Sequence, residues 1–216
     1  MKSRREVIRI LGRFVFAFAG VFSLAARKVG RAYADIKKRI LPGDTDPSKL
    51  SGDNPEYLDT RNLKIMPLER FGTMGDVDQD VDTKAWRLSV GGAVGNPLRI
   101  GYDELLQLPA IQKNVLLVCP GVFSYHARWT GVSIQELMKR AGVSGTAEKI
   151  FIRGQSRHGE KKEVFLLSEV KTDAVFLAYA VNGQTLPQKH GFPLRAVAEG
   201  HWGAEWIKYV THITFE

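Results

Sequence analysis

The sequence predicts an α+β domain built mostly from β-structure, with short helices on its flanks. Three observations favour this class. Short segments that alternate apolar and polar residues recur from residue 86 onward, with turn-forming residues between them. Helix signals are confined to two short segments, 102–108 and 133–142. The pair Asn182-Gly183 is a strong sequence signal for a β-hairpin.

The first predicted elements follow one another from residue 86. Residues 86–90 alternate like a half-buried strand, and residues 94–100 supply a turn and a second strand. A helix over 102–108 should end before Pro109, because proline cannot continue a helix. Four later segments are also predicted as strands: 117–119, 149–152, 164–167 and 207–215.

The second predicted helix has a signal at each end. Ser133 and Glu136 have the spacing of a capping box, in which two side chains bond free backbone N–H groups of the first turn. Gly142 stands where a helix end favours a left-handed residue. After this helix, residues 178–186 should form the hairpin around Asn182-Gly183.

The positive charge of the chain is concentrated at its N-terminus. The 216 residues carry a net charge of +8, but residues 1–34 hold eight of the 31 Lys and Arg and one of the 23 Asp and Glu. That segment alone therefore carries +7. A nucleic-acid-binding domain would carry its basic excess on the folded body, so nucleic acid is not an expected partner.

Residues 1–34 are interpreted as an export signal or an N-terminal anchor. A basic start precedes the apolar run 14–26, which is short for a membrane span of about 20 residues and suits the core of a signal. The stretch around Arg4-Arg5 resembles the twin-arginine signal, and residues 32–34 offer a cleavage pattern. The expected location is periplasmic. The alternatives are an uncleaved membrane anchor and a basic amphipathic helix on a membrane surface.

Two segments follow the N-terminus. Residues 35–66 are rich in turn-forming residues and poor in apolar periodicity, so they are predicted to be a linker or a strap running over the surface. Residues 67–216 are numerous enough to bury a core of their own. They are predicted to be the functional domain.

Cys119 is the only cysteine of the chain, and it lies between four apolar residues and a Pro-Gly turn. A free cysteine is often a small buried hydrophobe with a packing role only. An exported chain, however, normally pairs its cysteines, and an unpaired one suggests a reactive or liganded sulfur. Because the turn should expose the end of the strand, Cys119 is a candidate functional residue.

Four motifs occur in order through residues 67–216. They are Cys119 followed by Arg128-Trp129-Thr130-Gly131-Val132, then Asn182-Gly183-Gln184-Thr185-Leu186-Pro187, His190-Gly191-Phe192-Pro193-Leu194-Arg195 and Trp206-Ile207-Lys208. With these motifs at these separations, the segment resembles the sulfite oxidase family of molybdenum–molybdopterin oxidoreductases. The resemblance implies the mostly β, molybdopterin-binding fold of that family, with short flanking helices.

The resemblance also implies a cofactor and its ligands. In the family, the cysteine at this position ligates molybdenum held by one molybdopterin, which makes Cys119 both a metal ligand and a catalytic residue. A soft thiolate suits such a metal. The residues implied to surround the cofactor, whose phosphate needs cationic donors, are His190, Arg195, Trp206, Ile207 and Lys208. Tyr125, His126 and Arg128 lie a few residues beyond Cys119 and are candidates to face the substrate, the alternative being that they are ordinary loop residues.

The implied activity is two-electron oxygen-atom transfer on a small sulfur-type oxo substrate. Residues 72–76 depart from the family pattern, so part of the usual pterin cradle is expected to be replaced or missing. Glu205 stands where many relatives have a basic residue, which argues against an anionic substrate such as sulfite. The sequence has no Cys-x-x-Cys-His haem motif, and a further β-sandwich domain like that of some family members is not expected. A monomeric catalytic subunit that exchanges electrons with a membrane haem subunit or a cytochrome is therefore expected, with membrane contact only through the N-terminal segment.

Two other classes of function remain open. An exported cysteine hydrolase or transpeptidase would use Cys119 as its nucleophile, with His126 or His190 as the base. A non-catalytic binding module would keep the fold and lose the metal. Molybdenum analysis of the purified protein separates both classes from an oxidoreductase.

Overall fold

The computed structural model describes residues 37–157 and 159–216, and residues 39–216 form one compact unit. The export signal predicted over residues 1–34 lies outside the described residues. Within the described part of the chain, no helix is both long enough and apolar enough to cross a membrane.

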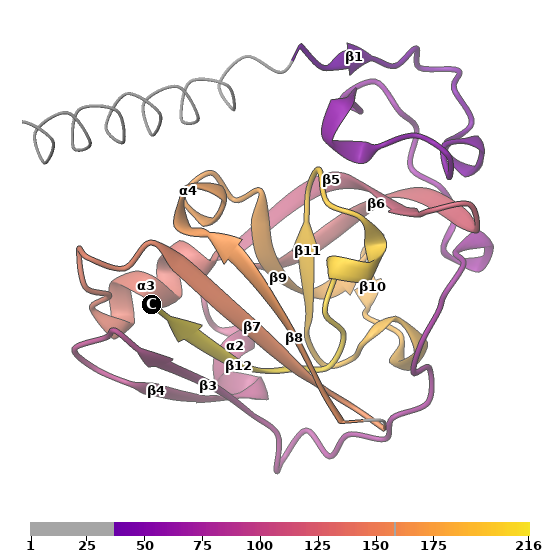
Figure 1. The fold of residues 1–216 in the computed structure, drawn as a ribbon. Helices are drawn as coiled ribbons and strands as arrows, with labels where there is room; N and C mark the ends of the chain where they lie inside the picture. Colours follow the sequence, from indigo (N-terminus) through magenta and orange to yellow (C-terminus); the bar gives the residue numbers. More distant parts are fainter. Residues whose placement is uncertain (1–36, 158) are drawn as a thin grey trace, which may run out of the picture. The chain divides into compact units, whose positions relative to one another are not determined.

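Two five-stranded sheets make up most of this unit (Figure 1). The first sheet has the order β10-β9-β6-β5 with β11 beside β9, and its strands are β5 (Ala110–Cys119), β6 (Phe123–Val132), β9 (Val175–Val181), β10 (Gln184–Thr185) and β11 (Arg195–Ala198). The second sheet has the order β4-β3-β12-β7-β8, and its strands are β3 (Arg87–Gly92), β4 (Leu98–Gly101), β7 (Lys149–Ser156), β8 (Gly159–Leu166) and β12 (Val210–Phe215). Within the two sheets, only β3 and β12 pair in parallel.

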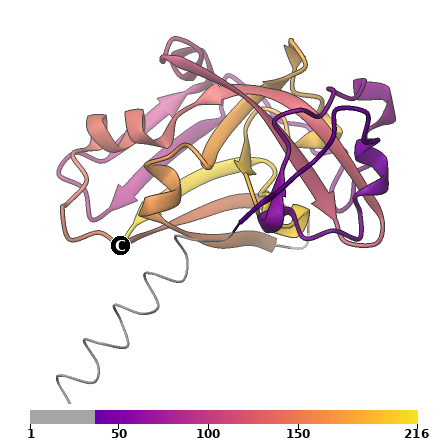
Figure 2. The ribbon, with the colours of Figure 1, turned by 90° about the horizontal axis from the view of Figure 1, so that it is seen from above.

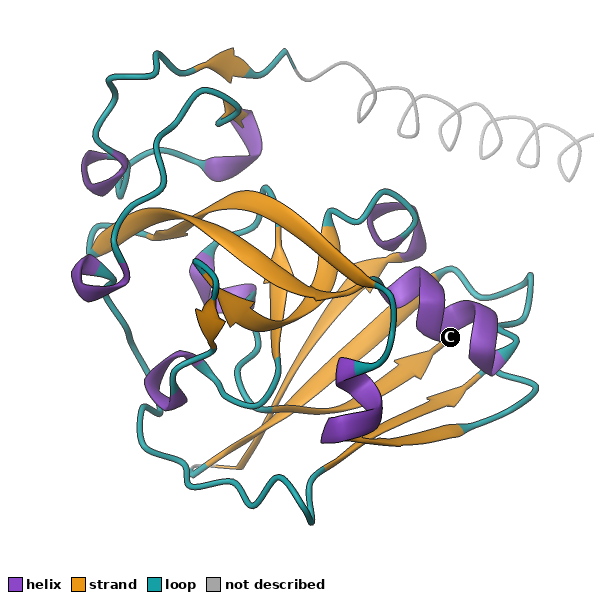
Figure 3. Ribbon diagram, turned by 180° about the vertical axis from the view of Figure 1, so that it is seen from behind, coloured by secondary structure: helices purple, strands orange, loops and turns teal. Residues whose placement is uncertain are grey.

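Short helices flank the sheets (Figure 3). The α-helices of the described residues are α2 (Tyr102–Leu106), α3 (Ile134–Ala141) and α4 (Leu167–Val170). Single 3₁₀ turns occur at η2 (Pro47–Lys49), η3 (Pro55–Tyr57), η4 (Leu68–Arg70), η5 (Gln188–His190) and η6 (Gly203–Glu205). The predicted α+β class with mostly β-structure is therefore confirmed.

Both predicted helices are present, with corrections at their ends. Helix α2 stops at Leu106, because Leu108 precedes a proline and disfavours helical backbone. Helix α3 begins after Ser133, whose Oγ accepts a bond from the Gln135 N–H, and it ends at Gly142 with a φ of 61°. The reciprocal half of the predicted capping box is wrong, since the Glu136 carboxylate binds Arg140 one turn later.

The predicted strands are found at the expected places in the sequence, but several begin or end at other residues. The hairpin turn lies at Asn182-Gly183, between β9 and β10. Strand β8 ends at Leu166, where α4 begins, and β12 begins only at Val210. Strand β6 was not predicted, although residues 123–130 alternate apolar and polar residues, which is the signal of a half-buried strand.

The side chains of both sheets share one hydrophobic core. Leu88, Ile152 and Phe215 of the second sheet belong to the same buried cluster as Val115 and Trp129 of the first. This core holds the two sheets together and fixes the positions of the strand ends that carry the candidate site residues.

A second, smaller apolar cluster covers the other face of β5. Four leucines of residues 39–66 pack against Leu116 and Val118 of that strand: Leu41, Leu50, Leu58 and Leu63. Residues 39–66 include the two-stranded parallel pair β1 (Arg39–Ile40) and β2 (Leu58–Asp59), drawn in indigo in Figures 1 and 2. The strand that ends in Cys119 is therefore covered on both faces.

Candidate functional site

A cavity of about 280 Å³ lies at the end of β5. Its walls come from β5, β6, β7, β8 and β11, from η5 and η6, and from residues 72–76. Six of the predicted site residues line it together: Cys119, Tyr125, His190, Arg195, Trp206 and Lys208. Residues that are far apart in the sequence thus meet at one site.

Cys119 is the last residue of β5 and pairs with Phe123 across the turn to β6. Its thiol is partly buried, and burial raises the pKa of this thiol. The Sγ atom lies 3.1 Å from the Sδ atom of Met74. The thiol is thus positioned by a rigid hairpin and faces a cavity lined near it by apolar side chains.

Tyr125 contributes an aromatic wall. Its ring stacks on Phe71, with the centroids 4.1 Å apart, and lies 6.0 Å from the ring of Phe123. Burial raises the pKa of the Tyr125 hydroxyl, which hydrogen-bonds with the guanidinium of Arg195. The hydroxyl therefore stays protonated at neutral pH and helps to orient Arg195.

Arg195 is a buried cation, only 2% exposed, at the start of β11. Its Nη1 donates to the His190 carbonyl at 3.0 Å, and the guanidinium lies 5.0 Å and 5.4 Å from the ring centroids of Trp129 and Trp206. The Nε atom has no hydrogen-bond partner, and the salt bridges of the described residues do not include Arg195. A buried charge without a counter-ion is costly, so an anionic group in the cavity would be strongly favoured.

His190 adds two further unused polar atoms. Both ring nitrogens are buried and have no hydrogen-bond partner in the described structure. Desolvation, together with the charges of Arg195, Lys189 and Lys208, lowers the pKa of His190 to about 3. The neutral ring offers one donor and one acceptor to a ligand in the cavity.

Lys208 is half-buried, and its ammonium is already engaged. The Nζ atom lies 2.8–2.9 Å from four acceptors, the Thr73 hydroxyl and the carbonyls of Met74, Asp76 and Lys189, which share its three N–H groups. Desolvation and the charge of Arg195 lower the pKa of Lys208 to about 8. To contact a phosphate, this ammonium would have to release one of these acceptors.

Two predicted site residues lie outside the cavity wall. Arg128 is exposed on the face of β6 opposite to Tyr125, because successive residues of a strand point to opposite sides. Ile207 is fully buried, and its carbonyl accepts a bond from the Ala196 N–H. Ile207 therefore supports β11, the strand that begins with Arg195.

His126 also lies on the face of β6 away from the cavity. Its Nδ1 atom is 3.3 Å from the Lys64 carbonyl, and its backbone carbonyl accepts from the Met66 N–H. The residue therefore contacts residues 39–66 and not Cys119.

The sequence analysis did not single out Lys161 and Tyr209, which line the cavity, and it noted Met74 only within residues 72–76 as a departure from the usual pterin cradle. Lys161 lies on β8 and donates to the Ala204 carbonyl in η6. The Tyr209 hydroxyl donates to the carbonyls of Gln188 and Asp76. Tyr209 directly follows the Trp206-Ile207-Lys208 motif, and this adjacency was the available signal.

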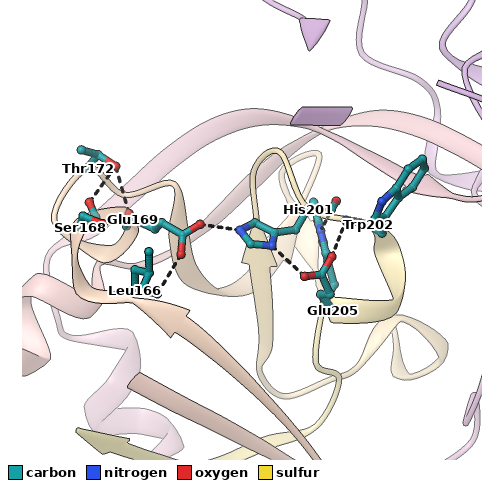
Figure 4. Close-up of polar contacts among 8 residues, drawn as sticks. Leu166, Ser168, Glu169, Thr172, His201, Trp202 and Glu205 are labelled. Carbon is teal, nitrogen blue, oxygen red and sulfur yellow. Dashed lines mark hydrogen bonds and ion pairs between the residues drawn. The ribbon is translucent and has the colours of Figure 1, made fainter. Parts of the chain in front are cut away.

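A charged cluster supports the η6 side of the cavity (Figure 4). His201 Nε2 lies 2.6 Å from a carboxylate oxygen of Glu169 in α4, and its Nδ1 lies 2.9 Å from a carboxylate oxygen of Glu205 in η6. Glu205 also accepts from the Trp202 N–H at 2.9 Å. The hydrogen bond with Glu169, opposed by desolvation and supported by Glu205, raises the pKa of His201 to about 9.

This cluster predicts a pH-dependent stability. The folded-state pKa of His201 is raised above the unfolded value of about 6.5. The contribution of His201 to the free energy of unfolding is therefore complete below pH 6.5 and is lost as the pH rises through about 9. After allowance for solvent screening, His201→Gln should lower the free energy of unfolding at pH 7 by about 1–2 kcal/mol. Urea unfolding from pH 6 to 10 measures this. If His201→Gln lowered the free energy of unfolding equally at pH 7 and pH 10, the charged pairing of His201 with Glu169 and Glu205 would be contradicted.

Residues 74–216 match the sequence profile of the oxidoreductase molybdopterin binding domain. The chain belongs to this family. The prediction of a molybdopterin-dependent oxidoreductase of the sulfite oxidase type is therefore confirmed.

Curated relatives of this family member include proteins of different lengths. It is 28% identical over 163 residues to nitrate reductase [NADH] 1 of Oryza sativa, covering 61% of this chain and 18% of that protein. It is 27% identical over 143 residues to the protein-methionine-sulfoxide reductase catalytic subunit of Gluconobacter oxydans, a match that covers 59% of this chain and 46% of that protein. An uncharacterized oxidoreductase of Bacillus subtilis is 29% identical over 138 residues, a match that covers 62% of this chain and 68% of that protein. The chain thus spans less than half the length of the first two relatives.

The fold is shared with a solved structure, the sulfane dehydrogenase SoxCD from Paracoccus pantotrophus. The TM-score is 0.61 at 22% sequence identity, and the match covers 83% of this chain and 50% of that chain. The predicted sulfite-oxidase-type fold is confirmed by this likeness together with the family membership.

Family membership assigns molybdopterin with molybdenum as the cofactor of this domain. The residues of the cavity fit such a group. The unpartnered Arg195 Nε suits an anion, the two free nitrogens of His190 suit a heterocycle with donors and acceptors, and the Cys119 thiol offers a soft ligand.

Proposed function

We propose that this chain is the catalytic subunit of an exported oxidoreductase that transfers an oxygen atom to or from a small, uncharged sulfur compound such as a sulfoxide. The observation that carries this proposal is the mixed lining of the cavity. Arg195 and His190 supply buried polar atoms without hydrogen-bond partners, and Met74, Leu117 and Phe123 supply apolar surface, with the Met74 Sδ atom 3.1 Å from the Cys119 Sγ atom.

The apolar part of the lining favours an uncharged substrate. A bound anion would lose hydration against the side chains of Met74, Leu117 and Phe123. Glu205, whose position the resemblance connects with basic residues, is bonded to His201 and Trp202. The name of the Gluconobacter oxydans relative, a methionine sulfoxide reductase, supports the same substrate class.

Each cavity residue has a proposed role. Cys119 ligates the metal as a thiolate, which requires loss of the proton that burial otherwise retains. Arg195 and His190 hold the pterin and its phosphate, with Lys208 as a further cation and Trp206 as an apolar wall beside Arg195. Tyr125 stays protonated, orients Arg195 and faces the substrate. When bound, the cofactor supplies two-electron oxygen-atom transfer.

A cysteine hydrolase is less well supported by this geometry. A nucleophilic cysteine needs a lowered pKa and an adjacent base. Here burial raises the pKa of Cys119, His126 faces away from the cavity, and the pKa of His190 is lowered to about 3. None of the described groups activates the thiol in the way that this mechanism requires.

Metal and pterin analysis tests the proposed function. The full chain should be produced in a host that assembles molybdopterin and purified by gel filtration. Near-stoichiometric molybdenum and pterin are expected, together with reduction of dimethyl sulfoxide or methionine sulfoxide by a reduced viologen dye. Protein that carries the cofactor but turns over only sulfite would overturn the substrate class, and absence of molybdenum would overturn the enzyme assignment.

The same preparation tests export and the electron partner. The paired Arg4-Arg5 supports export of a folded, loaded protein, with electrons exchanged through a membrane haem subunit or a cytochrome. Loaded wild-type protein is expected in the periplasmic fraction, whereas the variant with Arg4→Lys and Arg5→Lys should remain in the cytoplasm. Equal periplasmic yields of the two would contradict the twin-arginine pathway.

A further inference from the structure

Residues 72–76, here called the Met74 loop, line the cavity on the side of Cys119. Met74 is 56% exposed, yet its Sδ atom lies 3.1 Å from the Sγ atom of Cys119. One side chain therefore contacts both the solvent and the sulfur of the site. A molecule that approaches Cys119 along this side must pass the Met74 thioether.

Lys208 holds the Met74 loop in this position. Its ammonium donates to the Thr73 hydroxyl and to the backbone carbonyls of Met74 and Asp76. The Tyr209 hydroxyl donates to the same Asp76 carbonyl at 3.2 Å. Because backbone carbonyls are bonded, these contacts fix the path of the loop and leave the Met74 side chain free to adapt.

The other end of the Met74 loop packs directly on the hairpin that carries Cys119. A Cβ atom at Gly72 would lie 2.3 Å from the ring of Phe123, the residue that pairs with Cys119. Only a glycine allows this approach. The loop is thus bound at Gly72 by packing and at Thr73, Met74 and Asp76 by Lys208.

We propose that Met74 is the specificity-determining residue of this site and that Lys208 is its positioning residue. The flexible thioether sets the width of the path to the Cys119 sulfur, and the Lys208 ammonium keeps it there. The consequence for substrate choice rests on the proposed function, whereas control of access to the sulfur does not. The test therefore begins with the full chain prepared without cofactor.

Alkylation of the thiol measures this access directly. Cys119 is the only cysteine, so labelling followed by intact mass spectrometry reports one site. Met74→Ala should react about fivefold faster than wild type with the bulky reagent fluorescein-5-maleimide, and less so with the small reagent iodoacetamide. Lys208→Met, which keeps the apolar stem and loses the donors, should show the same preference.

Two matched controls separate this effect from general loosening. Val122 is exposed three residues after Cys119 and does not line the cavity, and Lys162 lies on β8 with its ammonium 3.8 Å from the Phe151 ring centroid. Val122→Ala and Lys162→Met should label at the wild-type rate, at equal thermal midpoints. A wild-type rate with both reagents in Met74→Ala would overturn the proposal, as would one in Lys208→Met.

The loaded enzyme then tests the substrate consequence. Met74→Ala should raise kcat/KM for methyl p-tolyl sulfoxide relative to dimethyl sulfoxide by about tenfold through KM, since a path narrowed by the Met74 side chain disfavours the larger substrate. Met74→Leu should keep the wild-type ratio. An unchanged ratio in Met74→Ala would overturn its role in specificity. If the wild type reduced no sulfoxide, the proposed function would be overturned instead. The alkylation rates would still show whether Met74 and Lys208 control access to the Cys119 sulfur.

Discussion

Cys119→Ser is expected to abolish oxygen-atom transfer while the protein stays folded. Serine is close in size to cysteine, and the thiol is only partly buried, so the change in packing should cost less than about 1.5 kcal/mol. A hydroxyl is a much harder and less acidic group than a thiol, and it does not replace a soft thiolate ligand. Turnover of dimethyl sulfoxide should fall by at least about 10³-fold, which corresponds to about 4 kcal/mol.

The measurement combines steady-state rates with thermal unfolding of the same preparations. Val122→Ala serves as the control, since its exposed side chain lies on the same turn and outside the cavity. It should keep both the rate and the unfolding midpoint. Wild-type turnover in a folded Cys119→Ser protein would remove Cys119 from the ligands of the metal.

Arg195→Ala is expected to lose the cofactor. Hydrogen bonds to charged groups contribute about 1.5–3 kcal/mol each, so alanine should weaken cofactor retention by at least about tenfold. Arg195→Lys keeps the charge and loses the planar fork that binds phosphate through two bonds, and it should lie between alanine and wild type. The lysine variant also fills part of the space beside Trp129 and Trp206, where alanine leaves a gap.

Molybdenum occupancy after gel filtration, compared at equal folded protein, measures this retention. Arg99→Ala is a matched control, because Arg99 is an exposed arginine of β4 outside the cavity wall. It should retain the metal fully. If Arg195→Ala retained as much molybdenum as the control, the phosphate would be bound elsewhere.

The sequence led to residues that line the cavity where a motif and a chemical need coincide. Cys119 follows a strand and precedes a turn, and Arg195 is the cation of a motif that the resemblance places at the cofactor; both line the cavity. Gly131, by contrast, is a motif residue with a packing role. A Cβ there would lie 1.8 Å from the Leu177 carbonyl, where β6 crosses β9.

What was not predicted is which side chains share a face. Tyr125 and Arg128 are three residues apart and therefore point to opposite sides of a strand. The alternation of apolar and polar residues over 123–130 was the available signal for that strand. Its apolar face belongs to the core, whereas Ser124 and His126 on its polar face contact carbonyl groups of residues 39–66.

The Met74 loop was visible in the sequence only as a departure from a pattern. Its place at the cavity depends on Lys208, which lies 134 residues later in the chain than Met74. A contact over such a separation has no local signal, since it depends on how the two sheets pack. The same reasoning applies to Lys161 and η6, which meet across the cavity.

The position of β12 determines when this domain can fold. Strand β12 follows every other strand in the sequence, yet it is the central strand of its sheet, paired with β3 on one side and β7 on the other. During synthesis, β3 and β7 have no partner between them until residues 210–215 leave the ribosome. Such non-local pairing makes folding slow, and the cavity residues 190–209 precede β12 directly. We therefore expect the cavity to be complete only after β12 has paired with both β3 and β7.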